Sequence, residues 1–371
     1  MNIAFMDLKT QFQRMEPAIR KRIDAVLAHG RYIMGPEIEE LEANLAELAG
    51  VKHVISCSSG TDALLMPLMA YGIQPGDAVF TTPFTFIATA EVIALLGARP
   101  VFVDIDPRTF NMDPVKLEAA VIRVKKEGKW RARGVIPVDL FGLAADYDAI
   151  SKVAEEHDLF VLEDAAQSLG GVYHGRPVGS LGHVAATSFY PAKPLGAYGD
   201  AGAIFTDDDE LANTLVSIRQ HGQGQDKYHN VRVGLNGRMD SIQAAVLLVK
   251  LERFGEELAA RQKVADWYGQ KLKYCTTPFV PTGLQSSWAL YSVLLEEREA
   301  VVKALNNVRI PSVIYYEVPL HCQEVFVDLG QGRGSFPVSE KVAGQILSLP
   351  MHPFLTETEV DAVAAVVNLF Q

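Results

Sequence analysis

The stretch HVISCSSGTDALLMPLMA, residues 53–70, has the pattern of one strand, one turn and one helix. A short β-rich run at residues 53–56 leads through a serine- and glycine-rich turn into a helical pattern over residues 61–70. The first backbone N–H groups of a helix have no partner within the helix and can hold a phosphate group. Such turns are also common without a ligand. The stretch therefore predicts a strand–turn–helix unit, and a phosphate site only in combination with other signals.

The same unit recurs through the first two-thirds of the chain. Further strands are predicted at residues 78–81, 100–103, 134–138, 159–162 and 185–189, and helices at residues 36–48, 87–96 and 147–156. This alternation predicts an α/β fold with a mainly parallel sheet that is covered by helices on both faces. Such sheets bind ligands at the carboxyl ends of their strands, so the active site is expected just after the strands.

The pattern changes near Ser241. Helices are predicted over residues 241–257 and 259–272, then a loop at 281–286, a strand at 288–294, a helix at 297–305, a strand at 312–316 and a final helix at 357–369. We therefore predict a large α/β domain, residues 1–250, and a smaller C-terminal α+β domain, residues 251–371.

Composition excludes several classes of function. The chain has 371 residues, of which 49% are hydrophobic, and a formal net charge of -11, which argues against nucleic acid or an anionic membrane as the main partner. No signal-peptide pattern is visible, and no uncharged apolar stretch reaches the roughly 18 residues of a membrane helix. The cysteines Cys57, Cys275 and Cys322 are far apart. We therefore expect a cytoplasmic protein without a disulfide framework or a metal site.

A lysine follows the last predicted strand of the first part, in the segment TSFYPAKPLGAYGDAG, residues 187–202. Lys193 is the only lysine between Lys152 and Lys227. Partly apolar surroundings disfavour the charged form of an amine, which lowers its pKa and makes it nucleophilic. That is the property needed to form a Schiff base with an aldehyde. For the lysine alone, a surface residue in a Gly/Pro loop is the more common explanation.

A carboxylate and an amide follow the preceding strand, in the segment LEDAAQS, residues 162–168. A carboxylate at a strand end can keep a pyridine nitrogen protonated, which makes the ring an electron sink. Asp164 would fit this role, and Gln167 could contact a phenolate oxygen on the same ring. Asp164 alone is at least as often a helix N-cap, and Gln167 can be a surface residue.

Hydroxyl groups and aromatic rings complete the set. The hydroxyls of Ser59 and Thr61 lie in the first turn described above, and Ser188 comes just before the lysine loop. In the segment TPFTFIA, Phe86 or Phe84 could stack on a flat ring, or both could be core aromatics. Lysine, aspartate, phosphate turn and aromatic each follow a different strand. Their convergence in one crevice predicts pyridoxal 5′-phosphate (PLP) as the cofactor.

Eight motifs carry a resemblance to a known family, and it extends nearly end to end. They are SSGTDAL, TFIATAE, VFVDID, EDAAQS, SFYPAKPLGAYGDAG, RQHG, NGRMDSIQAA and LPMHP. The chain resembles the DegT/DnrJ/EryC1/StrS family of PLP-dependent sugar aminotransferases, which has the aspartate aminotransferase-like fold (PLP fold-type I). The resemblance implies a homodimer with shared active sites.

The resemblance also implies a role for each matching residue. Lys193 would hold the cofactor as a Schiff base and move protons, Asp164 would pair with the pyridinium nitrogen, and Gln167 would bind the ring oxygen. Phe86 matches the stacking position. The implied phosphate ligands are Gly60, Thr61 and Ser188, with Ser59 in the same turn and Asn236 supplied by the neighbouring subunit.

The segment HGQGQDKYHNVRVGLNGR, residues 221–238, is similar to one branch of that family. That branch aminates C3 of UDP-2-acetamido-2-deoxy-3-oxo-glucuronic acid for the diamino sugars of surface polysaccharides. L-Glutamate would be the amino donor and pyridoxamine phosphate the intermediate form of the cofactor. Arg238 could bind a carboxylate of sugar or donor, or form an interface salt bridge. The other substrate-binding candidates are Tyr32, Tyr315, Tyr316 and His321.

Several alternatives remain open at this stage. Many relatives carry His-Tyr where this chain has Tyr315-Tyr316, which leaves sugar recognition open. The acceptor could instead be a dTDP-linked 3- or 4-keto-6-deoxyhexose or a UDP-linked 4-keto sugar. A regulatory or binding homologue without turnover is the non-enzymatic alternative. The basic stretch 123–133 is either an anion-binding patch or, as we favour, a solvated helix end and loop.

Overall fold

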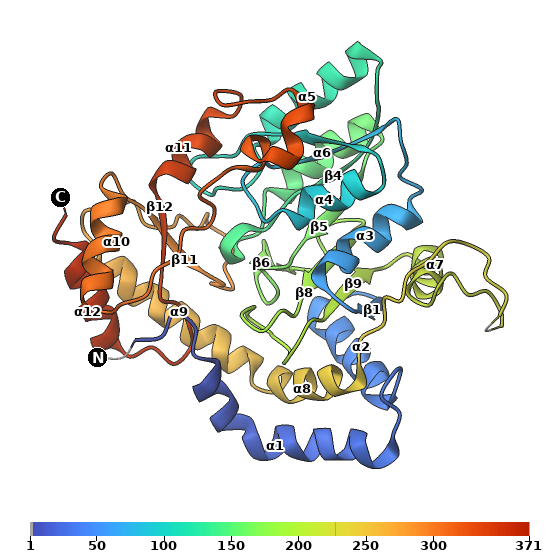
Figure 1. Ribbon diagram of the computed structural model, residues 1–371, viewed down its shortest axis with the longest axis horizontal. Coiled ribbons are helices and arrows are strands. Elements are labelled where there is room, and N and C mark those ends of the chain that lie inside the picture. Colours follow the sequence, from blue (N-terminus) through green and yellow to red (C-terminus); the bar gives the residue numbers. More distant parts are fainter. Residues whose placement is uncertain (1–2, 227, 371) are drawn as a thin grey trace.

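A seven-stranded sheet forms the centre of the computed structural model, which describes residues 3–226 and 228–370 (Figure 1). Its strand order is β1-β9-β8-β5-β4-β2-β3. The strands are β1 (His53–Cys57), β2 (Asp77–Thr81), β3 (Arg99–Phe102), β4 (Arg131–Ile136), β5 (Phe160–Asp164), β8 (Val184–Ser188) and β9 (Gly202–Thr206). Only β9 pairs antiparallel, with β1 and β8. The predicted α/β fold with a mainly parallel sheet is confirmed.

Helices cover both faces of this sheet. They are α2 (Pro36–Ala49), α3 (Gly60–Ala70), α4 (Ala88–Leu95), α5 (Pro114–Glu127), α6 (Tyr147–His157), α7 (Asp209–Arg219) and α8 (Ser241–Leu251), while α1 (Leu8–His29) packs on α8. Successive strand residues face opposite sides: Val79 packs in the core with α3, α4 and α7, whereas Phe80 packs in the core with α5 and α6. Burial on both sides explains the near-continuous hydrophobic runs of the strands.

The C-terminal part builds a second core. Its elements are α9 (Phe254–Lys271), β11 (Tyr291–Leu294), α10 (Arg298–Asn307), α11 (Pro337–Gln345), β12 (Ile346–Leu349) and α12 (Glu357–Val367). The shorter elements are β6 (Val172–Tyr173), β7 (Arg176–Pro177), β10 (Leu284–Gln285), η1 (Leu140–Gly142), η2 (Leu320–Cys322) and η3 (Glu324–Leu329). Ile3 also packs in this second core. The domain boundary at residue 250 stays a prediction. Through Ile3, the start of the described chain packs with the C-terminal part.

Other local predictions differ from the structure. The predicted strand 312–316 is wrong, because only Val313 pairs, in a single bridge with Ser348, before the chain turns at Tyr315. That turn lets Tyr316 reach Gln167 instead of continuing a sheet. The predicted helix 241–257 is divided into α8 and α9.

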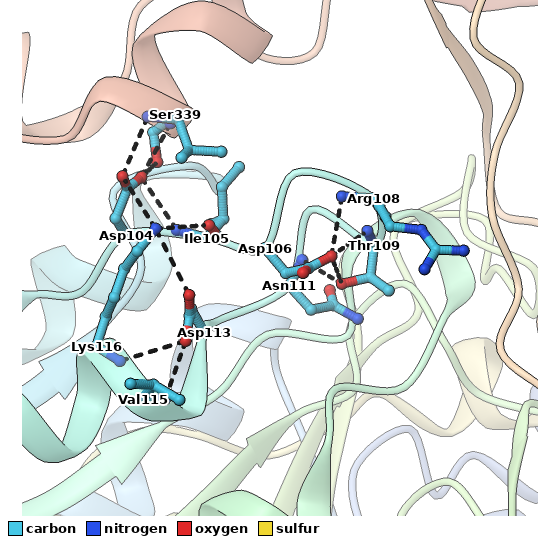
Figure 2. A network of polar contacts seen from close by, with 11 residues as sticks. Asp104, Ile105, Asp106, Arg108, Thr109, Asn111, Asp113, Val115, Lys116 and Ser339 are labelled. Atoms are coloured by element: carbon cyan, nitrogen blue, oxygen red, sulfur yellow. Dashed lines mark hydrogen bonds and ion pairs between the residues drawn. The ribbon is translucent and has the colours of Figure 1, made fainter.

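A buried carboxylate joins the C-terminal part to the sheet (Figure 2). Asp104, just after β3, accepts hydrogen bonds from the Ser339 N–H and hydroxyl at 2.9 and 2.6 Å and from the Val338 N–H at 3.1 Å. Burial raises the pKa of Asp104, but these hydrogen bonds outweigh it, so the pKa lies below its usual value. The first turn of α11 is therefore capped by a residue of the large sheet. This contact fixes the C-terminal part beside the ends of β2 and β3.

The basic stretch 123–133 has local partners. Lys125 donates to the carbonyl of His157 at 2.8 Å, and Arg131 pairs with Asp77 at 2.7 Å. Arg133 donates to the carbonyl of Tyr71, at the end of α3, at 3.0 Å. These contacts support a helix end and loop rather than an anion-binding patch. Among the described helices, none has the length and apolar character to cross a membrane. The cytoplasmic location stays a prediction.

Candidate active site

Lys193 lies in a tight loop that follows β8. The loop is closed by hydrogen bonds from Lys193 N–H to the Tyr190 carbonyl at 2.8 Å and from Ala197 N–H to the Phe189 carbonyl at 2.7 Å. Burial lowers the pKa of Lys193, and the negative charge of Asp164 partly opposes that effect. In the described residues no group accepts a hydrogen bond from its Nζ. These surroundings agree with the predicted role of the amine as a nucleophile.

A second buried lysine has a different task. Burial lowers the pKa of Lys250, on α8, to about 8. Its Nζ donates to the Gly196 carbonyl at 2.6 Å and lies 4.3 Å from the centre of the Tyr198 ring. Both partners belong to the loop that carries Lys193. Lys250 therefore holds that loop on α8, and its own amine is already engaged.

Asp164 ends β5 and is 4% exposed. Its Oδ2 accepts a hydrogen bond from the Thr89 hydroxyl at 2.8 Å, and its Oδ1 accepts one from the Ala166 N–H at 3.2 Å. Burial raises the pKa of Asp164, while these two hydrogen bonds and the charge of Lys193 oppose the rise. Because β5 and β8 are parallel neighbours, the carboxylate and the amine emerge at the same edge of the sheet.

The orientation of the Gln167 amide is fixed by its neighbours. Its Oε1 accepts a hydrogen bond from the Phe141 N–H at 2.9 Å, a contact that only the oxygen end of the amide can make. The Nε2 is thereby directed the other way, where it donates to the Tyr316 hydroxyl at 3.3 Å. Gln167 therefore presents N–H donors beside Tyr316, as a ring oxygen would require.

The two aromatic candidates have different surroundings. Phe84 is fully buried and packs edge-on against Phe141 and Tyr316, with ring centres 6.4 and 6.2 Å apart. Phe86 follows β2 and leaves 55% of its surface exposed. Only Phe86 therefore has an open ring face, which agrees with its predicted stacking role, while Phe84 belongs to the wall behind it.

The turn after β1 fits a phosphate group. Ser59 caps α3: its Oγ accepts from the Asp62 N–H at 3.0 Å, and its carbonyl accepts from the Ala63 N–H at 3.0 Å. The N–H groups of Gly60 and Thr61 are the remaining donors of this first helical turn. A Cβ on Gly60 would lie 2.6 Å from the Cβ and 2.9 Å from the Oγ of Ser188. The turn and the end of β8 therefore meet, as the sequence predicts.

Three further candidates are Asn236, Arg238 and Tyr32. The Ser58 N–H donates to the Gly237 carbonyl at 3.0 Å, which places the exposed Asn236 next to the turn. Within the described part of the chain, the buried Nε of Arg238 has no partner. Tyr32, which is half-exposed, accepts from the Ser241 N–H at 2.8 Å through its carbonyl. Asn236 and Tyr32 are exposed, whereas Arg238 is partly buried.

The remaining substrate candidates are placed differently from one another. Tyr315 is partly buried, its pKa raised by burial and by the neighbouring Tyr190. His321 is only 2% exposed, its Nε2 lies 3.0 Å from Glu340, and its ring packs on Phe336. The structure places His321 inside the packed C-terminal segment, so its predicted contact with substrate has no support from this geometry.

Behind the Asp164 segment lies a buried acidic pair that the sequence did not indicate. Asp139 accepts from the Ala145 N–H, the Tyr147 hydroxyl and the Ser168 hydroxyl, each at 2.9 Å. Burial raises the pKa of Asp139 well above its usual value, and the adjacent Glu163 raises it further. Burial also raises the pKa of Glu163 to about 7. Burial therefore favours the protonated form of both acids.

This pair predicts a pH dependence of stability. An acid whose pKa is raised on folding destabilises the fold as the pH rises, here from about 4.5, the usual pKa of Glu163, to about 7. Asp139→Asn cannot ionise. Its oxygen can still accept from the Ala145 N–H and the Tyr147 hydroxyl, while its NH2 group would donate to the Ser168 hydroxyl instead of accepting from it. We expect its unfolding midpoint to fall less between pH 5 and pH 8 than that of the wild type, by at least roughly 2 °C.

Thermal unfolding across this pH range tests the prediction. Asp148→Asn, an exposed carboxylate on α6, is the control and should follow the wild type. Equal pH dependence of Asp139→Asn and the wild type would contradict a raised pKa of Asp139 in the folded protein.

The chain matches one protein family over most of its length. The model of the DegT/DnrJ/EryC1/StrS aminotransferase family matches residues 13–368. A UDP-2-acetamido-2-deoxy-3-oxo-D-glucuronate aminotransferase of Pseudomonas aeruginosa is 48% identical over 98% of this chain and 99% of its own length. A pleiotropic regulatory protein of Geobacillus stearothermophilus is 43% identical over 97% of this chain and 96% of its own.

Solved structures with the same fold include family members. A DegT DnrJ EryC1 StrS aminotransferase from Brucella abortus is 51% identical, with a TM-score of 0.97 over 99% of this chain and 98% of its own. The NtdA protein of Bacillus subtilis, solved with bound PMP, the pyridoxamine form of the cofactor, is 30% identical, with a TM-score of 0.86 over 96% of this chain and 82% of its own.

Proposed function

This chain belongs to the DegT/DnrJ/EryC1/StrS aminotransferase family, and from that premise we propose that its acceptor is UDP-2-acetamido-2-deoxy-3-oxo-glucuronic acid, aminated at C3 with L-glutamate as donor. It is a PLP-dependent aminotransferase of sugar nucleotides. The proposed acceptor rests on the 48% sequence identity, over 98% of this chain, to the Pseudomonas aeruginosa enzyme of that specificity. The product would serve the synthesis of diamino sugars in surface polysaccharides.

Each half-reaction uses residues described above. When bound, PLP supplies the electron sink that stabilises negative charge at the reacting carbon. Lys193 would be the residue that holds PLP through the cofactor's aldehyde, and its amine, once freed by the amino donor, would move the proton between donor and cofactor. Asp164 would keep the ring nitrogen protonated, and Gln167 would donate to the ring oxygen. Phe86, whose ring is exposed, would cover the ring face and thereby exclude water from it.

A homodimer with shared sites is part of the proposal. Asn236 would complete the phosphate site of the partner subunit, and Arg238 would meet a carboxylate of the sugar or of glutamate. Two features support this: the side chain of Asn236 is exposed, and the buried Nε of Arg238 lacks a partner within the described residues. A guanidinium binds a carboxylate through paired N–H groups, so an anionic ligand fits this position.

The phosphate turn gives a prediction on cofactor affinity. In Gly60→Ala the new methyl group would press on Ser188, because its Cβ would lie 2.6 Å from the Cβ of that residue. We expect the PLP dissociation constant to rise at least ~10-fold, through the loss of one hydrogen bond to a charged group. Spectroscopic titration of the cofactor-free protein measures this. Gly255→Ala, where the Cβ meets nothing within 4 Å, is the matched control, and equal affinity of the two variants would count against the site.

A panel of keto sugars tests the proposed acceptor. Enzyme converted to its pyridoxamine form by glutamate is mixed with the proposed UDP-linked 3-keto uronic acid, dTDP-linked 3- and 4-keto-6-deoxyhexoses and a UDP-linked 4-keto sugar. We expect kcat/KM for the 3-keto uronic acid to exceed the others at least ~100-fold, because a polar site rejects ligands that leave its groups unpaired. Faster turnover of another sugar would replace the proposed acceptor.

The regulatory relative favours one second candidate, a binding function beside or without turnover. The same panel separates the two functions. Tight binding of a sugar nucleotide with no transfer of the amino group to any acceptor would favour the regulatory function.

A further inference from the structure

A buried threonine contacts the proposed ring-nitrogen carboxylate. Thr89, the second residue of α4, is 1% exposed, and its Oγ1 lies 2.8 Å from Oδ2 of Asp164. An ionised carboxylate can only accept hydrogen bonds, so the threonine hydroxyl is the donor. The Phe86 carbonyl lies farther away, at 3.3 Å, and is neutral. The single hydroxyl proton of Thr89 is therefore directed to Asp164.

A second hydroxyl stands behind the first. The Oγ1 atoms of Thr85 and Thr89 are 3.2 Å apart. Since Thr89 gives its proton to Asp164, Thr85 can donate to Thr89. Such a chain strengthens the terminal hydrogen bond, because each donor is polarised by the one before it. Thr85 precedes Phe86 in the segment between β2 and α4, and Thr89 follows it in the first turn of α4.

The Thr89 hydroxyl affects both the protonation state and the orientation of the Asp164 carboxylate. Only two groups in the described residues donate to it, the Thr89 hydroxyl and the Ala166 N–H at 3.2 Å, one to each oxygen. The two donors fix the plane of the carboxylate. Burial favours the neutral carboxylic acid, and the Thr89 hydrogen bond is the largest of the effects that oppose it. A neutral acid would hold a protonated ring nitrogen far less strongly.

We propose that Thr89 is a positioning residue that keeps Asp164 ionised and aimed at the cofactor nitrogen, and that it fixes this carboxylate relative to Phe86. The inference rests on the proposed role of Asp164. Thr89 itself touches neither cofactor nor substrate in this role. Its Oγ1 lies 3.3 Å from the Phe86 carbonyl, so the ring-covering aromatic and the carboxylate meet at the N-terminal end of α4.

Two substitutions at Thr89 separate the hydroxyl from the shape of the side chain. Thr89→Val keeps the shape and removes the donor, whereas Thr89→Ser keeps the donor. Thr81→Val is the matched control, because Thr81 is equally buried and its hydroxyl donates to the neutral carbonyl of Ile136 at 2.9 Å. The measurements are the PLP dissociation constant of the cofactor-free protein, the unfolding midpoint, and kcat and KM for glutamate.

We expect Thr89→Val to raise the PLP dissociation constant and to lower kcat by about 10-fold each, with little change in KM, since a hydrogen bond to a charged group is lost. Thr89→Ser should restore both values to within about threefold, and Thr81→Val should change neither beyond that range. If Thr89→Val behaves like Thr81→Val while Asp164→Asn is strongly impaired, only this inference is overturned. If Asp164→Asn is also unimpaired, the proposed role of Asp164 fails with it.

Discussion

Lys193→Arg is expected to lower the rates of both half-reactions by at least about 1000-fold, the scale of a missing proton-transfer group. Arginine keeps a positive charge and a similar length beside Asp164. Its guanidinium does not lose a proton in a protein, so it can neither attack an aldehyde nor carry a proton between two carbons. The unsubstituted lysine suits both tasks because burial lowers its pKa.

Two measurements detect the loss of the Lys193 amine. The holoenzyme should absorb at about 410–430 nm, in a band that borohydride removes, and Lys193→Arg should lack that band. Rapid mixing with glutamate, and separately with the keto sugar, measures each half-reaction. Lys152→Arg, an exposed lysine on α6, should retain wild-type rates. Normal turnover by Lys193→Arg would refute the assignment of the catalytic amine.

The convergence of the site was predictable because it follows from strand direction. Asp164 and Lys193 follow β5 and β8, which are parallel neighbours, and the phosphate turn follows β1 at the same edge. Each of these residues stands within a few positions of a recognisable strand. The rule that parallel strands present their carboxyl ends together then brings the side chains to one place. The contact between Gly60 and Ser188 is the clearest result of that rule.

Contacts between distant segments had no local signal. Thr89 and Asp164 are 75 positions apart, and Lys250 and Gly196 are 54 apart. A threonine in a helix or a lysine near a helix end has the same local pattern whether it faces solvent or a buried partner. His321 is the opposite case. It was predicted to contact the substrate, but its ring nitrogen lies 3.0 Å from Glu340 instead. The polar contacts that tune the site are set by tertiary packing.

Strand prediction failed where the sequence pattern and the chain path disagree. β9 (Gly202–Thr206) has the apolar run of a strand, but it follows the lysine loop without an intervening helix and runs antiparallel, outside the alternating pattern. Residues 312–316 have β-branched and aromatic side chains, yet packing of Tyr316 against Phe84 and its contact with Gln167 favour a turn. Tertiary contacts decided both cases.

Asp164→Asn is expected to reduce kcat by about 100-fold or more, on the scale of the electrostatic contribution of one oriented group. The substitution preserves the size of the side chain. The asparagine oxygen can accept from the Ala166 N–H, and its amide can donate to the Thr89 hydroxyl, whose proton can turn to the Phe86 carbonyl 3.3 Å away. What is lost is the charge that keeps the ring nitrogen protonated. The defect should therefore appear in the proton-transfer step rather than in KM.

The lost charge also changes the reactivity of the Lys193 amine. The charge of Asp164 raises the pKa of Lys193, so its removal should lower that pKa further. In cofactor-free protein, labelling of Lys193 by an amine-selective reagent should accordingly extend to lower pH in Asp164→Asn than in the wild type. Asp158→Asn, an exposed carboxylate at the end of α6, should show neither effect. A normal kcat together with an unshifted labelling profile would mean that the carboxylate and the amine do not act on the same ring.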